Sequence, residues 1–337
     1  MFKEGFVKQL WQLYLVEFFA GFYFPRAIVL LFLVGRGLSL AEIGLTVSVI
    51  YGFNLLFEYP TGIFADRFGR KKSLMIALCL YAVASLVYGS SFSLVGMLVA
   101  SAVQGIAWAF QSGAREALVY DSLKQFKLHH LNKDVVGVMD AIGLVGTMVT
   151  TLFGPWLFGV SDGLPYLLNG VAYLIAGVFL FSFVEVKIVH HESLKKHVFA
   201  GVKWLWNKRL LRFLVVMGIG LFWFENAWYS VNQIILVNNG LPVSFLSWFY
   251  IIAGVLGIIA GFVLPKLVGK WKKSVSLGWV IGLQVIALVG ISLLNPWLML
   301  FLSYGMFLGH MWWNYVEADV IHKVIPSRIR ATVLSGK

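Results

Sequence analysis

Long apolar runs follow one another along the whole chain, and they constrain its fold more than any other feature. A helix needs roughly 20 apolar residues to cross a hydrocarbon layer about 30 Å thick. Ten such runs, separated by turn signals, cover residues 9–34, 40–60, 73–90, 94–117, 135–160, 165–184, 211–237, 243–264, 275–294 and 297–320. The sequence therefore predicts an all-α polytopic membrane protein with ten spans.

The composition supports this prediction. Of the 337 residues, 60% are hydrophobic and 12% are charged, whereas an ordinary soluble domain carries about 25% charged residues. One soluble core cannot bury so many apolar side chains. The first run is too long for a signal-peptide core and is followed by nine more, so we expect it to be a retained helix.

The placement of charge predicts the topology. The formal net charge is +12. Basic residues cluster in alternate connections, at residues 3–8, 67–72, 124–133, 187–212, 266–273 and 323–330. The opposite connections hold one basic residue, Arg36. The positive-inside rule then places the N-terminus and the basic loops in the cytoplasm, in a bacterial inner membrane. Because the basicity reports topology, we do not expect nucleic acid as a partner.

The chain repeats itself with a shift of 203 positions. This shift aligns Gly37-Leu38 with Gly240-Leu241, and Ser73-Leu74 with Ser276-Leu277. With the same shift the last residue, Lys337, corresponds to the entrance of the run at 135–160. We therefore expect a protein of six plus six helices in which the last two are missing. The alternative is a natural ten-helix protein.

Three regions follow from the repeat. Residues 1–186 form an N-terminal six-helix bundle, and residues 211–337 form an incomplete C-terminal bundle with four helices and the approach to a fifth. Between them, residues 187–210 form a cytoplasmic linker. Its apolar residues recur at helical spacing with lysines on the other face, a pattern typical of a helix that lies in the membrane surface.

The charged stretch between the second and third runs carries a recognisable motif. It contains Gly62, the pair Asp66-Arg67, then Gly69 and Arg70. This spacing resembles the signature between the second and third helices of major facilitator superfamily transporters. A degenerate copy, PKLVGKWKKS, stands at the corresponding place in the second half. The resemblance covers the whole chain, is nearest in appearance to bacterial drug-efflux members, and implies two pseudo-symmetric six-helix bundles.

The resemblance also implies roles for this stretch. Asp66 would face the start of the eleventh helix, where a carboxylate is stabilised by the helix dipole. Arg70 would pair with Asp121 at the end of the fourth helix. Together they would form a latch between the two bundles that breaks and remakes. Gly62 and Gly69 would allow close backbone approach and a tight turn.

Three charged residues are expected inside the membrane. Glu17 and Arg26 lie in the run at 9–34, and Glu225 lies near the middle of the run at 211–237. A carboxylate at the centre of a membrane-spanning helix costs roughly 2.5–3.5 kcal/mol on insertion scales, so such residues are functional candidates. We predict that Glu17 and Glu225 couple transport to protons or substrate. Arg26 is expected either to pair with Glu225 or to reach the outer surface.

Polar and aromatic residues give candidates for a substrate site. The resemblance implies a central cavity lined by the first, fourth, seventh and tenth helices, with Gln104, Trp108, Gln111, Asn226, Tyr229, His310 and Asn314 as its lining. Many aromatics and few charges suit an amphiphilic or cationic organic substrate. Charged residues nearer the inner helix ends are expected to be gate contacts or solvated charges: Glu58, Arg115, Glu116, Asp140, Glu317 and Asp319.

Two positions depart from the pattern of proton-coupled drug exporters. Those proteins carry an arginine three residues before a Gln-Gly pair, but Ser101 stands at that place before Gln104-Gly105. Proton coupling is therefore not expected to use that arginine, and whether Arg26 replaces it stays open. Gly154-Pro155 partly resembles the glycine-proline pattern of antiporters, with Thr150 where another glycine is expected.

The residues and the resemblance together predict a secondary transporter that works by alternating access. We expect it to export amphiphilic or cationic organic compounds in exchange for protons. Its expected partners are a small molecule, protons and the lipid bilayer, and we expect a monomer. A sugar or metabolite symporter and an inactive fragment are the alternatives. The chain carries no HExxH, GxGD or P-loop motif, so no enzyme activity, cofactor or metal site is expected.

Overall fold

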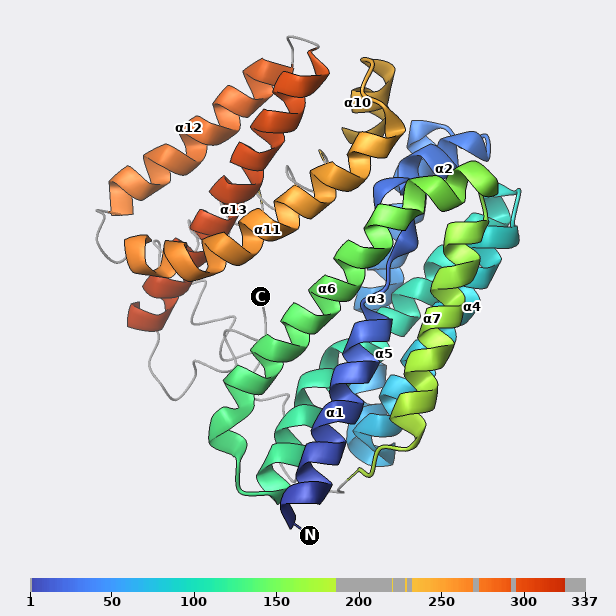
Figure 1. Cartoon of the computed structure of the whole chain (residues 1–337), viewed down its shortest axis with the longest axis vertical. Coiled ribbons are helices and arrows are strands. Elements are labelled where there is room, and N and C mark those ends of the chain that lie inside the picture. Colours follow the sequence, from blue (N-terminus) through green and yellow to red (C-terminus); the bar gives the residue numbers. More distant parts are fainter. Residues whose placement is uncertain are drawn as a thin grey trace. The chain divides into compact units, whose positions relative to one another are not determined.

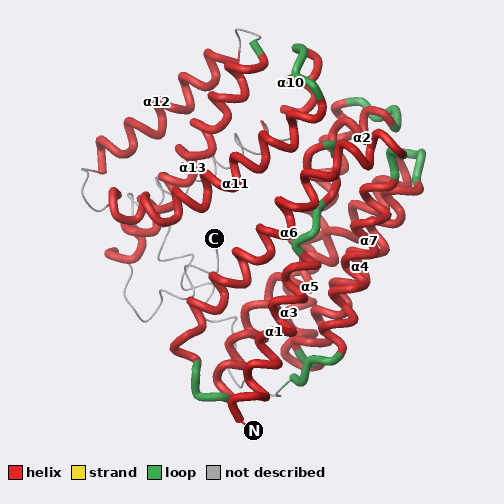
Figure 2. The backbone as a smooth tube through the Cα atoms, viewed as in Figure 1, coloured by secondary structure: helices red, strands yellow, loops and turns green. Residues whose placement is uncertain are grey.

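The computed structural model describes residues 2–185, 220, 228, 232–268, 273–291 and 295–324. Within these ranges the chain forms helices joined by short loops, and no residue lies in a strand (Figure 2). The predicted all-α class is therefore confirmed for the described part of the chain. Glu225, Asn226, Tyr229 and the linker at 187–210 lie outside the described residues.

The helices divide into two compact units. The N-terminal helical unit comprises Met1–His190 together with Val243–Ile251, and the C-terminal helical unit comprises His191–Pro242 and Ile252–Lys337. Figure 1 colours the helices along the sequence, from α1 in blue to α13 in red. The predicted boundaries of the linker stay a prediction, since the linker itself is not described.

The N-terminal helical unit is a bundle of long helices with an interruption near its start. Its elements before residue 190 are α1 (Phe2–Ala20), the 3₁₀ helix η1 (Phe24–Ala27), α2 (Val29–Gly35), α3 (Leu40–Phe68), α4 (Arg70–Ser90), α5 (Leu94–Gln125), the 3₁₀ helix η2 (His129–Leu131), α6 (Asn132–Val160) and α7 (Leu164–Phe181). α5 packs against α3 and α4, α4 packs against α7, and α1 packs against α6 and α7. Leu118, Leu123 and Leu180 are among the buried side chains at their contacts.

The second half contributes four helices to the described part of the chain. They are α10 (Asn232–Asn238), α11 (Val243–Val268), α12 (Lys273–Ile291) and α13 (Pro296–Val324). In the C-terminal helical unit, α13 packs against α12 and α10. Trp228 forms a small apolar cluster with Ala287 and Met306, and its Nε1 donates a hydrogen bond to Ser303 Oγ at 3.0 Å.

Most of these helices can cross a membrane. Six are long and apolar enough: Leu40–Phe68, Arg70–Ser90, Leu94–Gln125, Asp134–Val160, Leu164–Phe181 and Val243–Leu264. A seventh candidate is the pair Val7–Ala27 and Val29–Gly35, which is bent by 53°. The described helices lie on the predicted runs, apart from the run at 211–237, most of which is not described. The count of ten spans, with two further helices missing, stays a prediction.

The predicted repeat reappears in the helix starts. α3 starts at Leu40 and α11 at Val243, 203 positions apart. Gly37 and Gly240, three residues before these starts, have φ angles of 84° and 95°. Glycine adopts this left-handed region without a Cβ penalty. The same glycine turn therefore leads into the second helix of each half.

Arg36 holds together the connections at one end of the N-terminal helical unit. Its guanidinium donates to the carbonyl oxygen of Ser91 at 3.0 Å and to that of Gly89 at 3.2 Å. It also pairs with Asp162 at 3.0 Å, and its side chain is only 2% exposed. The sequence singled out this residue as the one basic residue of its set of loops, and the structure shows that it bonds two other connections of the bundle.

Candidate functional site

A charged cluster lies inside the N-terminal helical unit, on α1, α5 and α6. Arg115 donates from Nε to Glu17 Oε1 at 2.8 Å and from Nη2 to Glu17 Oε2 at 2.9 Å. The same Nη2 donates to Asp140 Oδ1 at 2.7 Å. The side chains of Glu17, Arg115 and Asp140 are 14%, 20% and 60% exposed. One guanidinium thus binds a largely buried carboxylate through both oxygens and an exposed carboxylate through one.

This cluster changes the interpretation of two residues. The sequence placed Arg115 and Asp140 among gate contacts and solvated charges, but the structure brings both to Glu17. A two-point contact between a guanidinium and a carboxylate is among the stronger charge-assisted pairs and defines the orientation of both groups. Glu17 and Arg115 lie 98 positions apart, so no local pattern in the sequence joins them.

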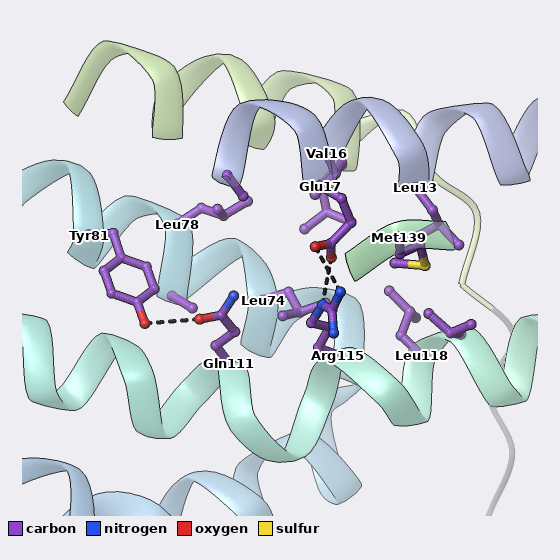
Figure 3. Close-up of a pocket in the computed structure, with 14 residues that line it drawn as sticks. Leu13, Val16, Glu17, Leu74, Leu78, Tyr81, Gln111, Arg115, Leu118 and Met139 are labelled. Atoms are coloured by element: carbon purple, nitrogen blue, oxygen red, sulfur yellow. Dashed lines mark hydrogen bonds and ion pairs between the residues drawn. The ribbon is translucent and has the colours of Figure 1, made fainter. Parts of the chain in front are cut away.

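A small cavity lies beside the Glu17–Arg115 pair. Its walls are mainly aliphatic side chains of α1, α4, α5, α6 and α7, and its polar members are Glu17, Tyr81, Gln111 and Arg115. Tyr81 donates its hydroxyl hydrogen to Gln111 Oε1 at 2.9 Å. Figure 3 shows this pair on one side of the cavity and the ion pair further along α5. We expected Gln111 in a cavity between two bundles, but it lines this cavity inside one helical unit.

The first membrane helix breaks beside this cluster. α1 ends at Ala20, and the chain resumes as η1. The break leaves backbone amides that the helix no longer pairs. Tyr23 N donates to Thr150 Oγ1 at 3.0 Å, and Phe24 N donates to Asn169 Oδ1 at 3.2 Å. Because unpaired backbone groups in a membrane cost several kcal/mol, these side chains make the break tolerable.

Glycines of α6 let α1 approach closely. A Cβ at Gly146 would overlap the carbonyl oxygen of Phe18, and a Cβ at Gly154 would overlap that of Phe24. Small residues at helix contacts allow such close backbone approach in membranes. The partial antiporter pattern around Gly154-Pro155 therefore has a packing explanation. Thr150 stands in place of a glycine because its hydroxyl binds the backbone of the broken helix.

The signature stretch forms a second charged cluster where α3 meets α4. Arg70 Nε contacts Asp121 Oδ2 at 3.0 Å, and Arg70 Nη2 lies 3.6 Å from Asp66 Oδ1. The side chain of Asp121 is 7% exposed and that of Asp66 is 48% exposed. The structure thus brings together the arginine and the aspartate that the resemblance paired. Their role in a latch stays a prediction, and the predicted partner of Asp66 lies outside the described residues.

A residue that the sequence analysis missed completes this cluster. Glu185 follows α7 and accepts hydrogen bonds from the backbone amides of Arg70 and Lys71, the first residues of α4. Lys71 in turn donates from Nζ to the carbonyl oxygens of Phe181 and Phe183, at 2.7 Å each. We attributed Lys71 to topology alone, but it binds the carbonyl end of α7. The one sequence feature that could have indicated Glu185 as a contact residue is its position directly after an apolar run.

The two glycines of the signature behave differently. Gly69 has φ of 108° and separates α3 from α4, as the predicted tight turn requires. A Cβ at Gly69 would also meet the carboxylate of Glu185. Gly62 lies within α3, and a Cβ there would meet nothing within 4 Å. Among the described residues no neighbour makes the close backbone approach expected at Gly62. Arg67 is exposed.

Ser101 occupies the position where drug exporters carry an arginine. It is fully buried. Its hydroxyl shares a hydrogen bond of 2.6 Å with the Tyr88 hydroxyl and lies 2.8 Å from the carbonyl oxygen of Met97. Because Ser101 is fully buried and hydrogen-bonded where α4 meets α5, a guanidinium could not take its place without displacing its neighbours. The packing of α4 against α5 thus accounts for the serine at this position.

The remaining candidates are spread over both units. Arg26 is partly buried and its guanidinium lies 5.3 Å from the ring centre of Tyr250, while its predicted partner, Glu225, is not described. Trp108 is 39% exposed and its ring lies 5.5 Å from that of Tyr51. Gln104 and His310 are half-buried, and the side chain of Asn314 is not described. No group of three metal-ligating side chains occurs in the described part of the chain.

The fold is that of membrane transport proteins. The crystal structure of the nucleoside transporter NupG superposes with a TM-score of 0.76 at 14% identity, over 98% of this chain and 85% of that one. At this identity the likeness shows the fold alone. A sequence model described as the Major Facilitator Superfamily matches residues 10–335. The chain therefore belongs to this superfamily.

Curated relatives agree with the family. An uncharacterized MFS-type transporter of Bacillus subtilis (strain 168), YxaM, is 23% identical over 262 residues, which are 73% of this chain and 62% of the relative. An uncharacterized transporter of Buchnera aphidicola subsp. Schizaphis graminum (strain Sg) is 27% identical over 181 residues, which are 51% of this chain and 43% of the relative. The chain thus spans about half the length of these relatives.

Proposed function

We propose that this chain is a proton-coupled secondary transporter that exports amphiphilic or cationic organic compounds by alternating access. The observation that carries the proposal is the two-point ion pair of Glu17 with Arg115 inside a bundle of membrane helices. A carboxylate in a membrane-spanning segment is costly unless it has a function or a partner. Here the partner is a cation, so proton uptake by Glu17 changes the contacts of both groups.

The ion pair gives the site two states. With Glu17 ionised, Arg115 ties α1 to α5. With Glu17 protonated, the attraction between the two groups falls to that of a neutral hydrogen bond. A proton can shift a conformational equilibrium only by binding more strongly in one state than in the other. Glu17 lies on α1, which ends three residues later at Ala20, where the chain breaks. A change in the charge of Glu17 therefore acts on α1 close to this break.

The signature stretch supplies the second part of the proposal. We propose that Arg70 with Asp121, and Asp66 with the start of a helix beyond α13, form a latch between the two bundles at one side of the membrane. Gly62, Arg67 and Gly69 belong to the same stretch. The contact of Arg70 with the largely buried Asp121 supports this role. When the latch is closed the transport path opens to the other side only.

The substrate class is proposed from the aromatic residues. The partly exposed ring of Trp108 next to Tyr51 offers a face for an organic cation. Gln104, Asn226, Tyr229, His310 and Asn314 remain the proposed further lining, and Arg26 and Glu225 the proposed second coupling pair. We place the protein in the bacterial inner membrane as a monomer with its N-terminus in the cytoplasm, on the distribution of basic loops.

Transport of ethidium in proteoliposomes tests the proposal. The purified chain is reconstituted, a pH gradient is imposed, and ethidium movement is followed by fluorescence. We expect movement against the proton gradient that a protonophore abolishes. The Glu17→Gln variant is expected to lose gradient-driven movement and to keep ethidium exchange without a gradient, because Gln cannot release a proton. Glu116→Gln, an exposed acid on α5, is the matched control and should behave as the unaltered protein.

Two results would contradict the proposal. Gradient-driven ethidium transport that is unchanged in Glu17→Gln would remove Glu17 from coupling. Movement of solute in the same direction as protons, seen with a panel of sugars and nucleosides in place of ethidium, would identify the symporter that the sequence left as an alternative. In both cases membership of the transporter family stands, since it rests on the sequence match.

A further inference from the structure

Arg115 is shared by two carboxylates, and the second one has no role in the proposed function. Resting on that function, we propose that Asp140 is a positioning residue: it holds the Arg115 guanidinium whenever Glu17 takes up a proton. Asp140 lies on α6 and Glu17 on α1, so the guanidinium on α5 connects three helices. Proton uptake at Glu17 would then leave α5 joined to α6 by an ion pair and to α1 by neutral hydrogen bonds only.

The Arg115 side chain need not move for this change. Nη2 already lies 2.9 Å from Glu17 Oε2 and 2.7 Å from Asp140 Oδ1. Nε lies 2.8 Å from Glu17 Oε1. When Glu17 is neutral, the guanidinium keeps its contact with Asp140 and gives up only the charge-assisted part of its contacts with Glu17. The ionised carboxylate that remains beside Arg115 is Asp140, the more exposed of the two.

Charge gives the physical reason for a second carboxylate. With both acids ionised, Arg115, Glu17 and Asp140 carry a net charge of −1, and proton uptake by Glu17 brings this to zero. Without Asp140 the same proton would leave the guanidinium without an ionic partner, although only 20% of its side chain is exposed. A cation that is largely buried and unpaired is strongly unfavourable. Asp140 therefore makes protonation of Glu17 easier.

The residues around Glu17 identify it as the group that takes up the proton. The cavity wall beside it is formed by residues of α4, α5, α6, α7 and α1 itself. From α4 the wall holds one titratable group, Tyr81, whose hydroxyl is bonded to Gln111. From α6 and α7 it holds Met139 and Leu180, which do not titrate. In the described part of the chain, Arg115 and Asp140 are thus the charged groups that face Glu17.

Infrared titration of the purified, reconstituted chain tests the inference and needs no substrate. The band of the protonated Glu17 carboxyl is identified by its loss in Glu17→Gln, and its intensity is followed against pH. In Asp140→Asn we expect the midpoint to move down by about one pH unit, the size of effect that a nearby charge commonly has. Asp140→Glu should keep the midpoint of the unaltered chain. Asp134→Asn removes an exposed acid from the same helix and should change nothing.

The outcomes separate the inference from the proposed function. If Asp140→Asn and Asp140→Ser both titrate with the unaltered midpoint, Asp140 does not position Arg115, while a titrating Glu17 band and loss of coupling in Glu17→Gln still support the transporter mechanism. If no band in the unaltered chain depends on Glu17, both proposals fail. Thermal unfolding of each variant accompanies the titration. A shifted midpoint at unchanged unfolding temperature, restored by Asp140→Glu, supports the inference, because general loosening of the bundle would not produce that combination.

Discussion

The two charged clusters of the N-terminal helical unit follow the same plan in different surroundings. In each, one arginine contacts a buried carboxylate and an exposed one. Arg70 binds Asp121, 7% exposed, and lies near Asp66, 48% exposed. Arg115 binds Glu17, 14% exposed, and Asp140, 60% exposed. The first cluster stands where α3 meets α4, and the second lies within the helices.

The difference between the clusters lies in what else holds them. Around Arg70, Glu185 binds two backbone amides and Lys71 binds two backbone carbonyls, so the helix ends themselves are tied together. Around Arg115 the contacts with Glu17 and Asp140 join side chains only. The Arg115 cluster thus joins helices through side chains alone, whereas at the Arg70 cluster the backbone at the ends of α4 and α7 takes part as well.

Removal of Arg115 is expected to have the largest effect. Arg115→Ala leaves Glu17 and Asp140 without their shared cation and should lower the apparent free energy of unfolding by about 3 kcal/mol, the low end for a broken buried pair because Arg115 is partly exposed. Titration with sodium dodecyl sulfate in detergent micelles measures it. Lys124→Ala, an exposed cation at the end of the same helix, is the control. Equal stability of the two variants would show that the cluster contributes nothing to the bundle.

The turn at Gly69 should come next. Gly69→Ala forces a Cβ into a backbone with φ of 108° and against Glu185, so a loss of about 2 kcal/mol is expected from backbone strain. Gly62→Ala is the matched control, since a Cβ at Gly62 meets nothing within 4 Å and alanine favours helix. The same unfolding titration compares them. If Gly62→Ala were the more damaging variant, the signature glycines would have the opposite roles.

The buried and exposed acids of the Arg70 cluster provide a smaller comparison. Asp121→Asn removes the charge beside Arg70 in a buried place and should cost about 1.5 kcal/mol. Asp66→Asn, in an exposed pair at 3.6 Å, should cost about 0.5 kcal/mol or less. Measured at low and high salt, only the Asp66 effect should shrink, because solvent ions screen exposed pairs. Equal costs would mean that burial does not distinguish the two carboxylates.

The hydrogen bonds at the break of α1 should show a smaller effect than Asp121, without any change of charge. Thr150→Val removes the acceptor of Tyr23 N while keeping the shape of the side chain, and should cost about 1 kcal/mol. Thr150→Ser keeps the hydroxyl and should lie close to the unaltered protein. Thermal unfolding of both variants in the same detergent provides the measurement. Identical unfolding temperatures would show that the broken helix does not depend on this bond.

The contact of Arg70 with Asp121 was predicted from the resemblance to the family, because both residues match positions that the family uses at its helix ends. The pairing of Arg115 with Glu17 and Asp140 could not be predicted. It depends on which sides of α1, α5 and α6 face one another. A helix that is apolar on nearly every side has no sequence pattern that identifies those sides. Thr150 illustrates the same limit. The sequence shows that it departs from a glycine pattern, but not that its hydroxyl binds Tyr23 N.

The sequence by itself determined that the described part of the chain is helical, where its helices lie, and that the start of α3 recurs 203 positions later at α11. These features depend on the length of apolar runs and on local turn residues, which act over a few positions. Only the tertiary structure decided which buried charges share a partner, why Gly69 rather than Gly62 meets a neighbour, and how a broken first helix keeps its amides bonded. Such contacts join residues about a hundred positions apart, and inside a membrane, where apolar side chains give little direction, hydrogen bonds and close glycine contacts select them.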